Sequence, residues 1–274
     1  MRSESDDHAP GTLFVVATPI GNLGDWTHRA EEILRSVDLV LCEDTRHTRK
    51  LVSRYGIRAK LQSYHNFNES EKTEPLVAEL LAGSSIALVS DAGTPTVSDP
   101  GFRLVRRCRE RGIPVIPIPG PSAVVTALSV SGLPTDEFHF VGFLPPKHEA
   151  RKRKLETLSH QTSTLVFYEA PHRLRSALED IREVLGDREV FVGREMTKLH
   201  EDYRFGRVSH VIAQVIERGE AVIVVEGARE RYVQDHEKLD LDGLSRQEIL
   251  KLAARRMGVG RKQLYDLLFK KTDD

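Results

Sequence analysis

Short apolar runs recur along the first half of the chain, and helical patterns separate them. The runs lie at 13–17, 38–42, 85–89 and 114–118, with helical patterns near 27–36, 44–55, 71–82 and 101–111. Continuous apolar runs of this length are typical of strands that are buried on both faces. Strands that alternate with helices predict a mostly parallel α/β sheet over this part of the chain.

The pattern restarts after Ser131-Gly132-Leu133-Pro134, a segment with the Gly and Pro typical of a helix end. Further apolar runs lie at 137–143, 164–168, 189–193 and 221–225, with helical patterns near 149–160, 171–185 and 207–217. We therefore predict two α/β domains, over 11–134 and 135–232, behind a disordered lead-in at 1–10.

The C-terminal segment 240–274 has a different character. Two helical patterns, at 244–257 and 261–269, flank the turn Gly258-Val259-Gly260, and Ser245 with Glu248 forms a capping box. Eight basic residues against two acidic ones give 246–271 a local charge of +6. A small helical hairpin of this kind resembles a helix-turn-helix that contacts nucleic acid. A docking or dimerising hairpin with a solvated basic face is the equal alternative.

Composition narrows the class of protein. The 274 residues carry a net charge of -1, which excludes a globally basic nucleic-acid binder but allows local basic patches. With 2 Cys, a disulfide framework or a four-Cys zinc site is excluded, so we expect a reducing compartment, the cytoplasm. No apolar stretch reaches the roughly 18 residues of a membrane span. P-loop, G-x-G-x-x-G, G-x-S-x-G and H-E-x-x-H motifs are absent, and we expect no metal.

Three loops rich in Gly, Pro and small residues follow predicted strands, at 18–25, 90–101 and 119–123. In open α/β sheets, ligands bind beyond the carboxyl ends of the strands, and Gly lets the backbone approach them closely. Asp91 comes directly after a strand, where its carboxylate could bind a ribose or an amino group. The three loops together predict a small-molecule site.

Polar clusters follow other predicted strands, at 43–48, 63–69, 167–173 and 193–198. A rim that mixes Arg, His, Tyr and carboxylates suits a polar substrate bearing phosphates. Asp44 and Thr45 could instead simply cap the next helix. A further basic cluster at 147–154 opens a predicted helix, where cations oppose the helix dipole. Phosphate contact and a solvated face remain equal alternatives for it.

Residues 12–227 as a whole resemble the tetrapyrrole methylase superfamily. The resemblance rests on the strings at 16–23, 43–46, 64–66, 89–101, 118–123, 131–134, 167–173 and 193–198. It implies two α/β domains with a cleft between them that binds S-adenosylmethionine. The strings are most similar to the branch of the superfamily that methylates the ribose 2′-hydroxyl of a decoding-centre cytidine in 16S rRNA.

The resemblance also implies roles for individual residues. The S-adenosylmethionine site would be lined by Pro19, Asp91, Ala92, Gly93, Thr94, Pro95, Gly120, Pro121, Ser122, Ala123, Phe167 and Met196. The family is usually dimeric, so a homodimer is expected, with 16S rRNA in the small ribosomal subunit as the partner. No membrane and no metal are implied.

Methyl transfer to a ribose hydroxyl is helped by a nearby base, because the hydroxyl is a weak acid. The candidate bases are Asp44, His65, Glu69 and Glu195, with the Asp44/His65 rim ranked first. The RNA-binding candidates are Arg46, Lys147, Arg151, Lys152, Arg173, Lys198, Arg255 and Arg261. A methylase of a tetrapyrrole or another small molecule is the alternative activity. A non-catalytic nucleic-acid-binding regulator built on the terminal hairpin is the alternative from another class.

Overall fold

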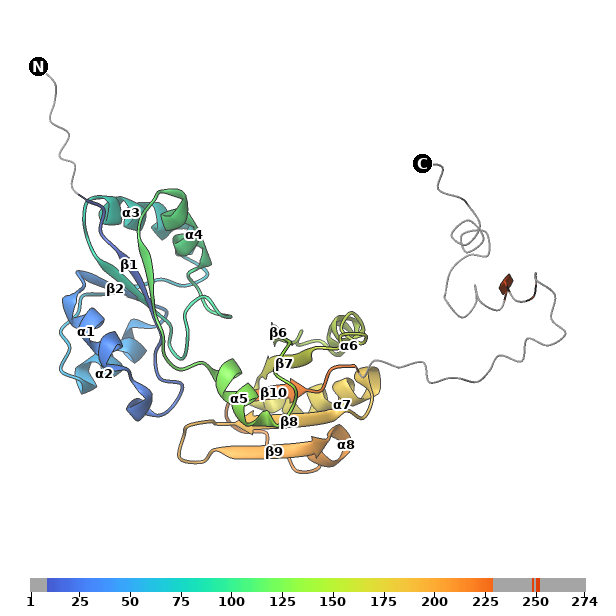
Figure 1. Ribbon diagram of the computed structural model, residues 1–274. Helices are drawn as coiled ribbons and strands as arrows, with labels where there is room; N and C mark the ends of the chain where they lie inside the picture. Colours follow the sequence, from blue (N-terminus) through green and yellow to red (C-terminus); the bar gives the residue numbers. More distant parts are fainter. Residues whose placement is uncertain (1–8, 229–247, 249, 252–274) are drawn as a thin grey trace, which may run out of the picture. The chain divides into compact units, whose positions relative to one another are not determined.

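The computed structural model describes residues 9–228, 248, 250 and 251, and its contacts divide the chain after Ala228. The predicted hairpin, with Arg255 and Arg261, lies outside the described residues except for these last three positions. Both sheets belong to the part up to Ala228 (Figure 1). No helix in 9–228 is long and apolar enough to cross a bilayer.

The first sheet is fully parallel, as the alternation of strands and helices predicts. Its order is β3-β2-β4-β1-β5, formed by β1 (Leu13–Val16), β2 (Leu39–Cys42), β3 (Leu61–Ser63), β4 (Ile86–Val89) and β5 (Val115–Ile118). The connecting helices are α1 (His28–Ser36), α2 (Thr45–Arg54), α3 (Glu69–Leu81) and α4 (Phe102–Glu110), with a 3-10 turn at Leu23–Asp25. The short, half-buried strand β3 leads into the polar cluster at 63–69, but no apolar run predicts its bounds, because its three residues carry too little pattern.

The second sheet is mixed. Its order is β6-β7-β10-β8-β9, formed by β6 (Phe138–Phe143), β7 (Thr164–Glu169), β8 (Glu189–Arg194), β9 (Asp202–Arg207) and β10 (Ala221–Val225). Only the β6/β7 pair is parallel, and the other pairs are antiparallel. The helices are α5 (Ala123–Ser131), α6 (His148–Glu156), α7 (Leu174–Leu185) and α8 (Val208–Val211), with a 3-10 turn at Pro171–Arg173. The predicted helix over 207–217 is wrong beyond Val211, since turns follow there.

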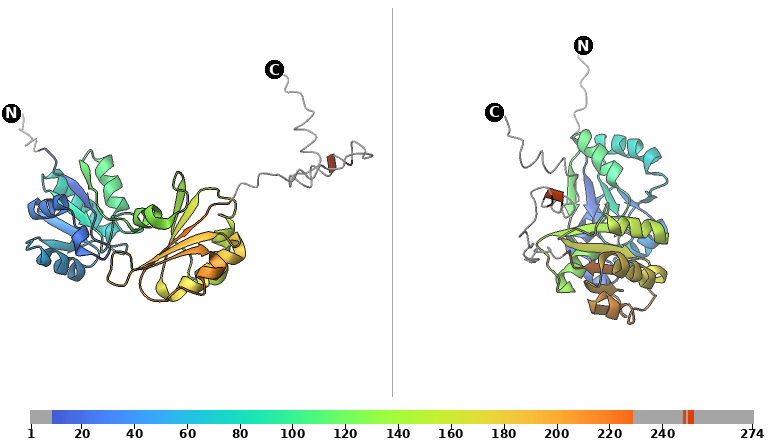
Figure 2. Two further views of the ribbon diagram at one scale, coloured as in Figure 1. Left: turned by 60° about the horizontal axis from the view of Figure 1, so that its bottom comes forward. Right: turned by 90° about the vertical axis from the view of Figure 1, so that its right-hand side faces the viewer.

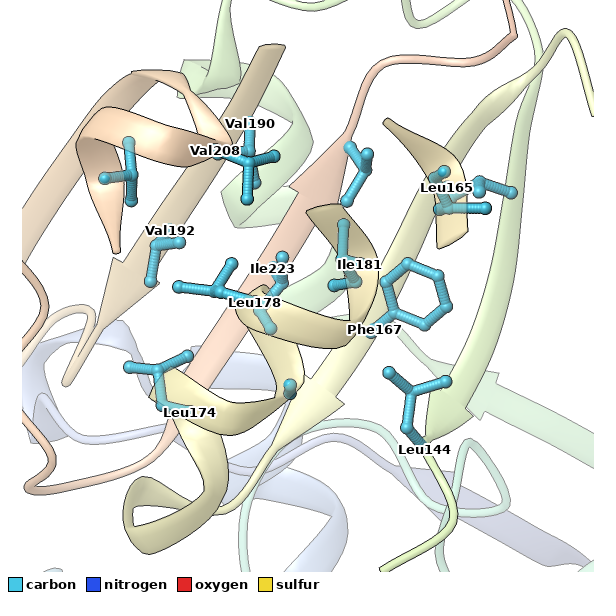
Figure 3. Close-up of a cluster of buried hydrophobic side chains, with 14 of the residues drawn as sticks. Leu144, Leu165, Phe167, Leu174, Leu178, Ile181, Val190, Val192, Val208 and Ile223 are labelled. Atoms are coloured by element: carbon cyan, nitrogen blue, oxygen red, sulfur yellow. The ribbon is translucent and has the colours of Figure 1, made fainter. Parts of the chain in front are cut away.

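The hydrophobic core of the second sheet lies between its strands and α7. Figure 3 shows Leu178 and Ile181 of α7 facing Phe167 of β7 and Ile223 of β10. All four side chains are fully buried. Helix α5 packs against the opposite face of this sheet. Its Val124 and Ala127 belong to a second buried cluster, which also contains Val166 of β7 and Val222 of β10. Figure 2 shows α5 following the first sheet along the chain and lying against the second.

The basic cluster at 147–154 opens α6, with Lys147 as the N-cap, and continues to the last turn of the helix. Helix α6 begins at His148 and ends at Glu156, so Arg153 and Lys154 lie in its last turn, where cations complement the helix dipole. Arg151 is 3% exposed, and its Nε lies 2.5 Å from Oδ2 of Asp180 on α7. Arg151 is therefore a structural residue that joins two helices and is not free to contact RNA.

Gly101, the N-cap of α4, ends the loop after β4 in a conformation that L-residues rarely adopt, with φ at 130°. An added Cβ would lie 2.5 Å from Cδ2 of Leu88 and 3.0 Å from Cγ2 of Thr96. We expect Gly101→Ala to lower the free energy of unfolding by about 1–3 kcal/mol, measured by urea denaturation. Gly112→Ala is the matched control, because Gly112 also has a positive φ but nothing within 4 Å. Equal losses in the two variants would contradict the steric part of this prediction.

Candidate active site

A pocket of about 420 Å³ lies at the carboxyl end of β4 and is closed by residues of the second sheet. Volumes of this size are typical of small-molecule sites. The predicted residues that line it are Asp91, Ala92, Gly93, Thr94, Ser122, Ala123, Glu195, Met196 and Lys198. Two of the three predicted loops, at 90–101 and 119–123, thus meet the 193–198 cluster at one cavity. Ile20, from the third loop, also lies in the wall.

The floor of the pocket is fixed by backbone pairing between Thr18 and Gly93. The Thr18 N–H donates to the Gly93 carbonyl at 2.9 Å, and the Gly93 N–H donates back at 3.1 Å. The Thr18 hydroxyl also donates to the Ser90 carbonyl at 3.1 Å. Gly93 has a φ of 85°, which explains a glycine here. This bridge holds the loop after β4 against the loop after β1.

Carboxylates give the pocket wall a negative character. Burial raises the pKa of Asp99 to about 6, and the negative charges of Glu43 and Asp91 raise it further. A hydrogen bond from Ser90 acts in the opposite direction but is weaker than burial. Burial and the charge of Asp91 likewise raise the pKa of Glu43. Burial and Asp99 raise the pKa of Tyr168 to about 12, so its phenol is neutral at physiological pH. The wall around Asp91 and Asp99 therefore favours a cationic ligand.

Lys198 joins two acidic side chains on the other side of the pocket. Its Nζ lies 2.8 Å from Oε1 of Glu195 and 3.1 Å from Oε2 of Glu220. Glu195 also accepts from the Glu220 N–H at 2.9 Å, and its backbone has a φ of 51°. Burial is the largest single effect on Glu195 and opposes its ionisation. The hydrogen bonds from Lys198 and from the Glu220 N–H, together with the charges of Lys198 and Arg194, outweigh burial and lower the pKa of the carboxyl. The Glu195–Lys198 pair is thus an ionised part of the pocket wall.

Five predicted cofactor residues do not line the pocket. Pro19 and Pro95 are buried beside it, and the Pro121 carbonyl supports it by accepting from the Thr94 hydroxyl at 3.2 Å. Gly120 lies against Ala17, where an added Cβ would come within 3.0 Å. The Phe167 side chain belongs to the core under α7, and its neighbour Tyr168 faces the pocket. Tyr168 lines the pocket in place of Phe167 because successive side chains of a strand point to opposite faces of the sheet.

Asp44, His65 and Glu69 lie outside the pocket wall. Asp44 is the N-cap of α2: its carboxylate accepts from the Arg46 N–H at 2.8 Å and pairs with the Arg46 guanidinium. These hydrogen bonds hold the pKa of Asp44 well below its usual range. His65 Nε2 lies 3.1 Å from Nδ2 of Asn68, and Glu69 pairs with Arg103 at 3.3 Å. The capping alternative for Asp44 is therefore confirmed, and Glu195 alone of the four candidate bases lines the pocket.

The RNA-binding candidates have different surroundings. The Arg46 side chain is 84% exposed while it pairs with Asp44, and Lys147 is exposed beside α6. Lys152 pairs with Glu183, and Arg173 lies 2.6 Å from the buried carboxylate of Glu169. Arg46 and Lys147 are thus the candidates in the described chain that present a cation most openly.

The residues that line the pocket but were not predicted as site residues include Asp99, Phe143, Tyr168 and Glu220. Asp99 lies in the loop 90–101, just before α4, and Tyr168 is the second-last residue of β7. Both fall within the strings that resemble the tetrapyrrole methylase superfamily, and that was an available signal. Phe143 ends the edge strand β6, and Glu220 directly precedes β10. Nothing local distinguishes these last two, because their place in the wall depends on the pairing of the second sheet.

Comparison with known proteins agrees with this fold and site. Residues 12–212 match the family model of Tetrapyrrole (Corrin/Porphyrin) Methylases, and the chain belongs to this family. Its members use S-adenosylmethionine as the methyl donor. The chain is 46% identical to ribosomal RNA small subunit methyltransferase I of Escherichia coli O157:H7, over 96% of both chains. It is 48% identical to the protein of that name from Vibrio cholerae, over 88% of this chain and 87% of the relative.

Among solved structures, uroporphyrin-III-C-methyltransferase from Thermus thermophilus has the same fold. The match has a TM-score of 0.57 with 22% sequence identity, and covers 79% of this chain and 94% of that protein. At this identity the likeness shows the fold alone. The predicted fold class, an α/β protein of the tetrapyrrole methylase type, is confirmed.

Proposed function

We propose that this chain transfers a methyl group from S-adenosylmethionine to the ribose 2′-hydroxyl of a decoding-centre cytidine in 16S rRNA of the small ribosomal subunit. The observation that carries the proposal is an acidic pocket of cofactor size in a chain 46% identical to a ribosomal RNA small subunit methyltransferase I. This substrate would place the protein in the cytoplasm, where ribosomes assemble.

The pocket suits S-adenosylmethionine on chemical grounds. The donor carries a positive sulfonium, and the carboxylates of Asp91 and Asp99 offer the opposite charge in a partly buried wall. Gly93, Ser122 and Ala123 leave room for close approach to the backbone. We propose that the loop 91–94, Ser122, Ala123 and Met196 hold the cofactor. When bound, the sulfonium supplies an electrophilic methyl group.

Positioning supplies much of the rate enhancement in such a displacement, because an in-line geometry replaces a bimolecular encounter. The residues of the pocket wall would also assist loss of the hydroxyl proton. We propose that the Lys198 ammonium, held in place by the ionised Glu195 carboxylate, stabilises the negative charge that develops on the ribose oxygen. This assignment replaces the Asp44/His65 rim as the first candidate, because neither residue lines the pocket.

We also propose a homodimer, formed through one face of the second sheet. Val125 and Val130 of α5 and Tyr203 and Phe205 of the edge strand β9 are all exposed hydrophobic residues. The end of α5 is close to β9, since a Cβ added at Gly132 would lie 4.0 Å from the Phe205 ring. Covering this apolar surface and the unpaired edge of β9 with a second copy would remove both from water.

Methyl transfer from tritiated S-adenosylmethionine tests the proposed function directly. We expect label in the 2′-O-methyl of one cytidine when small subunits are the acceptor, with naked 16S rRNA and a tetrapyrrole as parallel acceptors. Lys198→Ala should lower kcat by about 10²–10³-fold, the range for removing one electrostatic stabiliser, and leave cofactor affinity nearly unchanged. Label in the tetrapyrrole alone would overturn the proposal in favour of a small-molecule methylase.

A further inference from the structure

Phe143 is a large apolar side chain left open at the pocket. It is the last residue of β6, it contributes to the pocket wall, and it is 57% exposed. It does not belong to any buried hydrophobic cluster of the described chain. Its exposed area therefore continues the pocket wall outward, where a ligand that covers it would remove apolar surface from water.

A bulge in β6 sets the position of this ring. Phe140 pairs with Val166 and Gly142 with Phe167, so Val141 is an extra residue, and Gly142 has a φ of 78°. Without the extra residue, Phe140 and Phe143 would point to opposite faces of the sheet, because they are three positions apart. With it, both rings contact Tyr168, at centroid distances of 4.9 and 5.5 Å. The bulge thus turns Phe143 toward the face of β7 that lines the pocket.

The surroundings of Phe143 favour a flat, neutral ring as its ligand. The Tyr168 ring supports it from one side at an angle of 59°, and its phenol stays neutral because its pKa is raised to about 12. The exposed part of the Phe143 ring has no charged partner among the described residues. A nucleobase stacked on an exposed aromatic ring is the usual mode of recognition for unpaired RNA.

We propose that Phe143 stacks on the base of the nucleotide that receives the methyl group. This inference rests on the proposed function. The base and the 2′-hydroxyl are attached to adjacent carbons of one ribose, so a hydroxyl that reaches the pocket brings its own base to the pocket border. If that base is unstacked when its ribose enters the pocket, an aromatic ring at the border replaces the lost stacking. Phe143 is then a substrate-binding residue.

The test compares Phe143→Ala with Phe143→Trp in methyl transfer to small subunits. Loss of one stacked base should raise KM for the subunit roughly 5- to 150-fold, while kcat changes less. Phe143→Trp should stay within about threefold of the wild type, because it keeps an aromatic face. Phe138→Ala is the matched control: Phe138 begins the same strand and is 46% exposed, but it does not line the pocket. We expect its KM to be unchanged.

A second measurement separates the base from other occupants. The substrate is a small subunit assembled around a ligated 16S rRNA whose target nucleotide is abasic. With the wild type, this subunit should raise KM by the same factor as Phe143→Ala does. With Phe143→Ala, removal of the base should raise KM no further. Three results would overturn the inference: unchanged KM in Phe143→Ala, an equal loss of S-adenosylmethionine affinity, or dissociation of a dimer in that variant. Absence of methyl transfer by the wild type would instead overturn the proposed function, and this inference with it.

Discussion

Arg151→Ala should lower the free energy of unfolding by about 3–5 kcal/mol, the usual cost of leaving one partner of a buried ion pair alone. Arg151 and Asp180 are both nearly inaccessible to solvent, and their side chains are 2.5 Å apart. Asp180 also lies 2.8 Å from Nδ1 of His148, a weaker and more exposed partner. Removing the guanidinium would therefore leave a buried carboxylate with little compensation. Urea denaturation of the purified variant measures this loss.

A neighbouring pair on the same two helices provides the control. Lys152 pairs with Glu183, which is largely exposed, so Lys152→Ala should cost far less stability than Arg151→Ala. The double variant Arg151→Met, Asp180→Leu should recover most of the loss, because apolar residues of similar volume can replace a buried pair. If Arg151→Ala and Lys152→Ala lose the same amount, the buried pair does not have the structural role assigned to it.

Asp99→Asn should weaken S-adenosylmethionine binding by about 10- to 150-fold near pH 8, which corresponds to about 1.5–3 kcal/mol for a hydrogen bond or contact to a charged group. The variant keeps the size of the side chain and removes its charge. Isothermal titration calorimetry with S-adenosylmethionine measures the loss. The neutral product S-adenosylhomocysteine should lose much less affinity, because the carboxylate faces no sulfonium in that complex.

The raised pKa of Asp99 gives the same prediction a pH dependence. Below about pH 6 the carboxyl is protonated, so wild-type affinity for the cationic cofactor should fall as the pH drops through this value. The pKa of Asp99 is about 6 in the folded protein and 3.8 in the unfolded chain, so the folded protein binds this proton more tightly. Asp99 therefore lowers the free energy of unfolding as the pH rises from about 4 to 6. Asp99→Asn should abolish both effects. An affinity profile in the variant that matches the wild type would contradict this role for Asp99.

The main strands could be predicted because their apolar runs are continuous and buried. Leu13–Val16, Leu39–Cys42, Ile86–Val89 and Ala221–Val225 all fall within predicted runs. β9 could not be predicted from apolar content, since Asp202–Arg207 lies at a sheet edge and alternates half-buried with exposed residues. The antiparallel pairing of the second sheet was also invisible, because alternation of elements does not determine strand direction.

The candidate site was predicted in part, for an equally physical reason. Loops such as 90–101 are recognisable because Gly and Pro mark the backbone that a ligand approaches. The separation of Tyr168 from Phe167 depends on which face of β7 meets α7, and a list of residues does not contain that information. A carboxylate after a strand, such as Asp44, suits catalysis and helix capping alike, and its bond to the Arg46 N–H shows that it caps α2.

The acidic wall beside Asp91 and Asp99 has a consequence for turnover. The methyl donor has a net positive charge, and the spent cofactor, after the methyl has left, has none. The attraction between these carboxylates and the sulfonium therefore disappears with the chemical step, because the by-product has no sulfonium charge. Charge alone would make departure of the by-product easier than departure of the donor. The wild type should therefore favour the donor over the by-product more strongly than Asp99→Asn does.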